Sequence, residues 1–79
     1  MPRRRRDPEP IAKVFGEAVR GRREERGWTL ERLAEELGSG DHGRYVGEVE
    51  RGFHSPTLTT AKRIADALDV PLAELVADL

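Results

Sequence analysis

Apolar residues recur along most of this chain at spacings of three and four, the period of an amphipathic α-helix. The first such run predicts a helix over residues 11–26, which Gly27 can end as a C-cap. Its apolar positions are Ile11, Val14, Phe15, Ala18 and Val19. One face of this helix is therefore expected to pack against the rest of the chain.

Two shorter helices follow, separated by a turn. Thr29 offers an N-cap for the first of them, and Gly38 ends it. Its apolar positions are Leu30, Leu33, Ala34 and Leu37. Residues 39–43 are typical of a turn, and Asp41 can cap the helix that follows.

That third helix is predicted over residues 44–50, with Gly52 after it. Thr57 can cap a fourth helix, and Pro71 suits the first position of a fifth. The inward positions are Val46 and Val49 in the third helix and Leu58, Ala61, Ile64, Ala65 and Leu68 in the fourth. The apolar stripe of the fifth helix consists of Leu72, Leu75, Val76 and Leu79. No segment shows sustained strand-like alternation, so the prediction is a compact all-α domain of five short helices.

Length and composition narrow the class of protein. The chain of 79 residues suits one domain, and so small a domain often needs support beyond its core. It contains no cysteine and only two histidines, which excludes disulfides and argues against a metal site. With no nucleophile constellation and no phosphate loop, neither an enzyme nor a cofactor is expected. No apolar run approaches the ~20 residues of a membrane span, and no secretory signal is seen, so a cytoplasmic protein is predicted.

Charge is unevenly distributed. The net charge is −1, but residues 1–27 carry nine Lys/Arg against five Asp/Glu. Residues 1–10 contain four arginines and three of the five prolines, which predicts a disordered basic arm ahead of a domain over residues 11–79. The run Arg3–Arg6 can follow a DNA backbone or enter a minor groove, and it can equally remain a solvated tail.

Three segments in order resemble one family, the phage-repressor and Cro-type (xenobiotic-response-element) helix-turn-helix regulators. They are EERGWTLERLAEELG (residues 24–38), YVGEVERG (45–52) and SPTLTTAKRIADALDVPLAEL (55–75). The resemblance covers residues 11–77 and implies an all-α five-helix fold and sequence-specific binding of operator DNA. The middle segment also resembles the controller proteins of restriction-modification systems, which are compact dimers of about this length.

The sequence departs from the family at several positions. Leu30 stands where a glutamine often binds a phosphate, and the turn between Gly38 and Tyr45 is about two residues longer than usual. Arg22 replaces a core leucine and is predicted at the edge of the core with its charged end in water. The resemblance also implies that Glu50 pairs with Arg23 as part of the scaffold.

The third helix is the predicted reader of DNA, because the N-terminal residues of such a helix contact base edges. Arg44 is the first choice, since a guanidinium can pair bidentately with guanine, and Glu48 can accept from cytosine. Tyr45 can bind a phosphate or cover the core, and the Thr29 hydroxyl can bind a phosphate, cap its helix, or do both. The full set of candidates is Thr29, His42, Arg44, Tyr45, Glu48, Arg51, His54 and Ser55.

The last helix is the predicted dimer surface. Its apolar residues, if they do not all face the parent core, allow a homodimer that reads two half-sites about 34 Å apart. These residues are Leu72, Leu75, Val76 and Leu79. The alternative is a protein-interaction module such as an antitoxin, favoured by the acidic balance of residues 28–56. DNA binding instead predicts that Arg44, Tyr45 and Thr29 share one positive face.

Overall fold

The computed structural model describes residues 9–79, so the predicted basic arm, including Arg3–Arg6, lies almost entirely outside the described residues. The described part consists of helices and loops without a strand. The helices are α1 (Pro10–Glu25), α2 (Leu30–Glu36), α3 (Arg44–Glu50), α4 (Leu58–Ala67) and α5 (Leu72–Leu75). The predicted all-α five-helix fold is confirmed.

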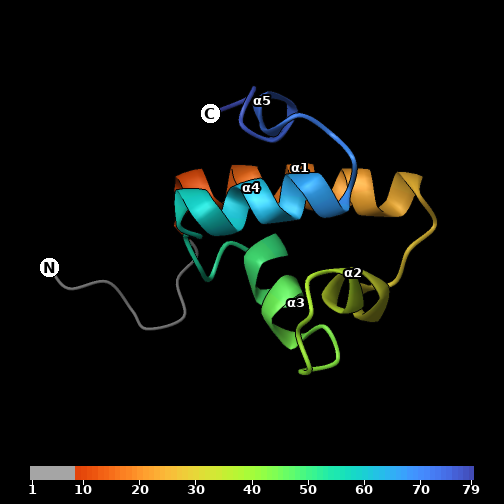
Figure 1. Cartoon of the computed structure of the whole chain (residues 1–79). Helices are drawn as coiled ribbons and strands as arrows, with labels where there is room; N and C mark the ends of the chain where they lie inside the picture. The colour runs from red at the N-terminus through yellow and green to blue at the C-terminus, as the bar shows by residue number, and fades with distance from the viewer. Residues whose placement is uncertain (1–8) are drawn as a thin grey trace, which may run out of the picture.

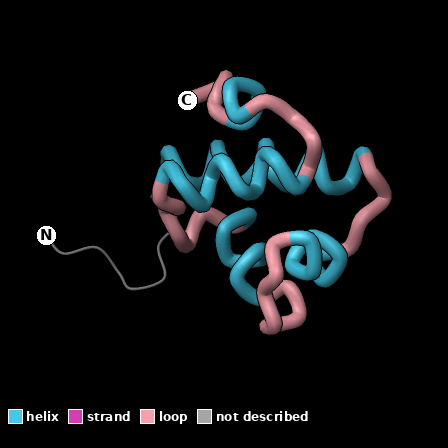
Figure 2. Tube along the Cα trace, in the orientation of Figure 1, coloured by secondary structure: helices cyan, strands magenta, loops and turns pink. Residues whose placement is uncertain are grey.

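The helices form a small stack with α1 and α4 in its middle. Helix α5 packs against α1 and α4 on one side, while α2 and α3 lie on the opposite side (Figure 1). The loop between α2 and α3 projects away from the body of the domain (Figure 2). The helix-turn-helix unit and the C-terminal helix therefore occupy opposite ends of the molecule.

Side-chain caps set the starts of α2 and α4 as predicted. The hydroxyl of Thr29 accepts from the backbone N–H of Arg32 at 3.0 Å, and that of Thr57 accepts from Thr60 at 3.1 Å. Two boundaries differ from the prediction. Helix α1 begins one residue earlier, at Pro10, and Pro71 precedes α5 instead of opening it. Both prolines lie at the start of a helix, where the missing N–H of proline costs no helical hydrogen bond.

The core combines residues from all five helices. It consists of Phe15, Val19, Leu33, Ala34, Val46, Val49, Ala61, Ile64, Ala65, Leu68 and Leu75. Two residues predicted to face inward do not, because Ile11 is 62% exposed and Leu58 is 76% exposed. Each lies in the first turn of its helix, and both line the same surface groove. The hydrophobic pattern identified the correct face of α1 and of α4, but it wrongly predicted that the first turn of each helix is buried.

Helices α1 and α3 cross at very short range. A Cβ atom added to Gly16 would lie 2.2 Å from the carbonyl oxygen of Val49 and 2.6 Å from that of Glu50. Real Cβ atoms do not approach backbone atoms so closely, so only glycine fits at this crossing. Gly16 thus sets how near the end of α3 can lie to α1.

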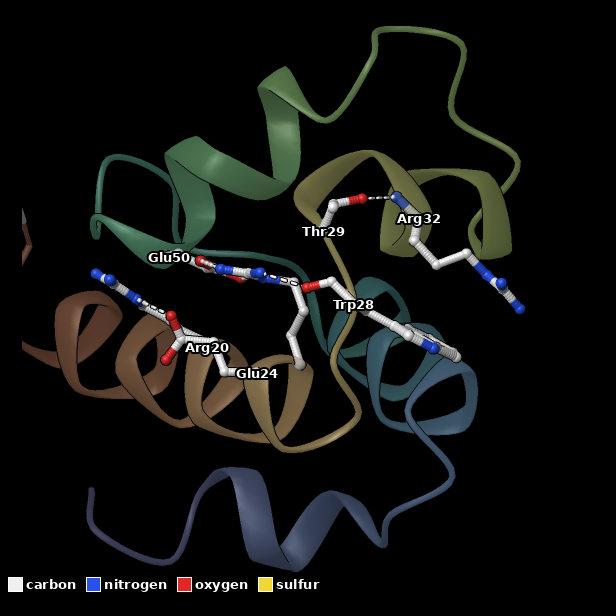
Figure 3. Close-up of polar contacts among 7 residues, drawn as sticks. Arg20, Glu24, Trp28, Thr29, Arg32 and Glu50 are labelled. Carbon is white, nitrogen blue, oxygen red and sulfur yellow. Dashed lines mark hydrogen bonds and ion pairs between the residues drawn. The ribbon is translucent and has the colours of Figure 1, made fainter.

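A buried ion pair holds the same crossing. Arg23 donates from Nε to Glu50 Oε2 at 2.7 Å and from Nη2 to Oε1 at 3.1 Å, as the family resemblance implied. Its Nη1 donates to the backbone oxygen of Trp28 at 2.6 Å (Figure 3). The hydrogen bond to Glu50 raises the Arg23 pKa, which outweighs the lowering by burial. One side chain therefore joins α1, the end of α3 and the segment that leads into α2.

Arg22, next to this pair, lies at the edge of the core. Its side chain is 37% exposed, and its Nη2 lies 2.9 Å from Oε2 of Glu74 in α5. The prediction of an edge position is confirmed, with an ion pair at its charged end.

Candidate nucleic-acid interface

The start of α3 is determined by Asp41. Its Oδ1 accepts from the Ser39 hydroxyl at 2.8 Å and from the Gly43 N–H at 3.1 Å, while Oδ2 accepts from the Tyr45 N–H at 2.9 Å. These bonds, the one from Ser39 foremost, lower the Asp41 pKa. Asp41 therefore caps the first turn of α3 through the Tyr45 N–H, as predicted, although Gly43 occupies the N-cap position itself. Helix α3 begins at Arg44 despite the long turn.

Gly43 brings the first turn of α3 against the first turn of α2. Its φ is +89°, a conformation that L side chains rarely adopt, and an added Cβ would lie 2.8 Å from the carbonyl carbon of Leu30. Glycine is therefore required here by both the backbone angle and the contact. Thr29, the cap of α2, and Arg44, the first residue of α3, consequently belong to neighbouring turns.

Arg44 projects from the N-terminal turn of α3 with 77% of its side chain exposed. Its neighbour Tyr45 is half-buried and packs against the core, and burial raises the pKa of its phenol. The Arg44 side chain is thus accessible to a ligand. The Tyr45 ring covers the core and remains partly exposed.

Glu48 and His54 join Arg44 and Tyr45 in one cluster. Nε2 of His54 lies 2.8 Å from Oε1 of Glu48, and Nε of Arg44 lies 3.7 Å from Oε2. The His54 ring stacks on Tyr45 with the ring centres 5.2 Å apart and the planes at 28°. Four of the predicted site residues therefore meet on one face.

The remaining candidates lie around this cluster. His42 is exposed in the projecting loop at 3.8 Å from Glu31, and the Arg51 guanidinium lies 5.5 Å from the Phe53 ring centre. Thr29 is exposed, and its capping hydroxyl still has a proton to donate. Ser55 is exposed but lines an apolar groove at the other end of the loop.

That groove is the main feature that sequence reasoning missed. Ile11, Leu58 and Leu79 are the exposed large hydrophobic residues among those described, and all three line it. Leu72 and Val76 contribute from α5. Leu75, which was predicted at a dimer surface, is 1% exposed and lies in the domain's own core, so it has no surface to offer a partner.

Two other classes of site were searched within residues 9–79. No group of three or more His, Asp or Glu side chains is placed to hold a metal ion. None of the helices there has the length and apolar character required to cross a membrane.

A helix-turn-helix family model matches residues 19–75, a span that includes α2, the turn and α3. This chain belongs to the helix-turn-helix family. The predicted family and the all-α fold are thereby confirmed.

Three relatives show how far the similarity extends. The chain is 35% identical over 68 residues to "HTH-type transcriptional regulator SutR" of Escherichia coli (strain K12), a match covering 86% of this chain and 37% of that protein. The restriction-modification controller protein C.AhdI from Aeromonas hydrophila superposes with a TM-score of 0.76 at 36% identity, covering 85% of this chain and 98% of the other. The clp gene regulator ClgR from C. glutamicum gives a TM-score of 0.79 at 26% identity, covering 91% and 90%. The helix-turn-helix chain thus spans little more than a third of its curated relative.

Proposed function

We propose that this helix-turn-helix chain is a cytoplasmic transcriptional regulator that binds operator DNA sequence-specifically through α3. The observation that carries the proposal is Arg44, which is highly exposed on the first turn of α3 beside the first turn of α2. In this motif the N-terminal residues of the second helix contact base edges in the major groove. A bidentate guanidinium contact to guanine is the chemistry Arg44 supplies.

The surrounding polar groups are proposed to bind the DNA backbone. Thr29 and Tyr45 supply hydroxyl donors, and His54 supplies an imidazole from the loop after α3. Arg51 and His42 are exposed at the margins of this face and are assigned outer phosphate contacts, whereas Ser55 lines the apolar groove and is assigned none. Such contacts set the register of the protein on the duplex without reading sequence.

The first experiment is fluorescence anisotropy with the DNA upstream of the protein's own gene and a scrambled duplex, over a salt series. We expect preference for the upstream duplex and an affinity that falls as salt rises, since bound cations release counterions from DNA. Equal, salt-sensitive binding to both duplexes would contradict autoregulation from that site. Absence of binding to either at low salt would overturn the DNA-binding proposal.

Replacing Arg44 by alanine is expected to weaken specific binding about tenfold to a hundredfold, because a good bidentate base contact contributes roughly 1–3 kcal/mol of discrimination. The same anisotropy titration measures the effect. Arg20→Ala is the matched control, since Arg20 is also exposed, on α1, and its loss removes the same charge. If the two variants lose specific affinity equally, Arg44 does not read a base.

We further propose that the apolar groove pairs two copies of the chain. Three large hydrophobic side chains are exposed together in one groove, and exposed apolar patches of this kind often mark protein–protein contacts. A two-fold dimer presents two copies of α3 to two half-sites, and the groove lies away from the reading face. The predicted contacts at Leu72, Val76 and Leu79 are retained, Leu75 is withdrawn, and Ile11 and Leu58 are added.

Leu58→Glu is expected to convert the dimer to a monomer, because a carboxylate in the groove would have to be desolvated. Sedimentation velocity measures the change. Thr59→Glu is the control, since Thr59 occupies the same first turn of α4 and does not line the groove. A wild-type protein that sediments as a monomer at micromolar concentration would contradict the dimer.

The similarity to C.AhdI favours a narrower function, that of a restriction-modification controller. That protein matches over 98% of its length, and the match extends across the segment YVGEVERG. Upstream-DNA binding in the anisotropy experiment would support it. If no duplex binds, the protein-interaction alternative, such as an antitoxin, replaces both.

A further inference from the structure

We propose that Glu48 acts as a positioning residue for DNA binding, holding His54 and Arg44 in place, and does not itself read a base. This inference rests on the proposed function. It departs from the sequence prediction, in which the Glu48 carboxylate accepts a hydrogen bond from cytosine.

The first observation is the position of the carboxylate. The Glu48 side chain is only 16% exposed, whereas Arg44, one turn earlier on the same helix face, is 77% exposed. A base reader must present its polar end to the groove. Glu48 instead directs both oxygens at side chains of the protein, with Oε1 at 2.8 Å from Nε2 of His54 and Oε2 at 3.7 Å from Nε of Arg44.

The second observation is how His54 is held. Its Nε2–H donates to Glu48 while its ring stacks on Tyr45, so two side chains of α3 fix one side chain of the following loop. The backbone supports the same geometry, because the N–H of Phe53 donates to the carbonyl oxygen of Glu48 at 2.9 Å. The loop that follows α3 therefore holds the His54 imidazole against α3 itself.

The third observation concerns charge. A carboxylate facing DNA phosphates is repelled, which lowers affinity unless cations lie beside it. Here the guanidinium of Arg44 lies beside the Glu48 carboxylate, and the imidazole of His54 donates a hydrogen bond to it. The Glu48 carboxylate by itself would therefore disfavour DNA binding. Here it positions Arg44 and His54, two side chains that are proposed to contact the DNA.

The test compares two variants that both lack the charge. Glu48→Gln keeps an oxygen that can accept from His54, whereas Glu48→Ala keeps none. A positioning role predicts that E48A binds a selected duplex about tenfold more weakly than E48Q, the effect of roughly 1.4 kcal/mol. In a His54→Ala background the difference between the two variants should fall to about twofold or less, because His54 is gone and only the 3.7 Å contact with Arg44 still distinguishes them.

The duplex comes from a randomised pool selected separately with wild type and E48Q. Positioning predicts the same consensus from both, while a consensus changed at one base pair would show that Glu48 reads that base and overturn the inference. Equal affinities of E48A and E48Q would also overturn it. Circular dichroism confirms that each variant is folded.

A measurement without DNA separates this inference from the proposed function. The ring NMR shifts of His54 and Tyr45 in the free protein should change in E48A and remain close to wild type in E48Q. Unchanged shifts in E48A would contradict the positioning role even if wild type binds DNA. A wild-type protein that enriches no duplex would overturn the proposed function, and with it any role of Glu48 in DNA binding.

Discussion

Replacing Glu50 by alanine is expected to destabilise the domain by about 3–5 kcal/mol, the cost of leaving a buried charge without its partner. Glu50 is 8% exposed and Arg23 is 9% exposed, so water cannot take over the lost hydrogen bonds. Native proteins have total stabilities of roughly 5–15 kcal/mol, so the variant should lose a large share of its stability. Thermal unfolding followed by circular dichroism measures the effect.

The control for this prediction is an exposed ion pair. Arg32 and Glu36 pair one helical turn apart in α2 with side chains 51% and 39% exposed. Glu36→Ala should change stability by less than about 0.5 kcal/mol, since such surface pairs contribute little. The double variant Arg23→Met with Glu50→Leu should recover much of the loss, because a buried pair can be replaced by apolar side chains. A Glu50→Ala protein as stable as Glu36→Ala would contradict the buried pair.

Gly16→Ala is expected to destabilise the domain by about 3 kcal/mol, at the upper end of the range for overpacking. The added methyl would overlap backbone oxygens of Val49 and Glu50, and a backbone cannot turn aside as a side chain can. Helices α1 and α3 would have to separate, which also loosens the Arg23–Glu50 pair. Urea denaturation gives the change in the free energy of unfolding.

The matched control lies in the same helix. An added Cβ at Gly21 meets no atom within 4 Å. Gly21→Ala should therefore be neutral or stabilise the domain by up to about 1 kcal/mol, the difference in helix propensity between the two residues. If the two alanine variants unfold at the same urea concentration, the close approach of α1 to α3 at Gly16 would be contradicted.

Local chemistry accounts for the elements that sequence reasoning predicted well. Thr29 and Thr57 each begin a helix because a side-chain oxygen can accept from a free N–H three residues on, which the sequence alone indicates. Asp41 stabilises the start of α3 in a related way, although it accepts from the N–H groups two and four residues on and Gly43 holds the N-cap position. The pairing of Arg23 with Glu50 was implied by the family resemblance, since 27 residues separate the two and no local rule joins them.

The positions that were predicted wrongly depend on distant parts of the chain. Hydrophobic periodicity identifies one face of a helix, but it does not say which part of that face another element covers. Ile11 and Leu58 lie on the expected faces yet remain exposed, while Leu75 is buried where a dimer contact was expected. Burial at these sites is decided by where α5 crosses α1 and α4.

The sequence by itself determined the five helices, the side-chain caps of α2 and α4 and the faces that form most of the core, because these follow from helical periodicity and from contacts within a few residues. Tertiary structure alone decided that Glu48 holds His54, that Gly16 sits under the backbone of α3 and that three apolar side chains share one groove. Those features depend on how helices cross, and a crossing depends on packing between residues far apart in the chain, which no short-range pattern encodes.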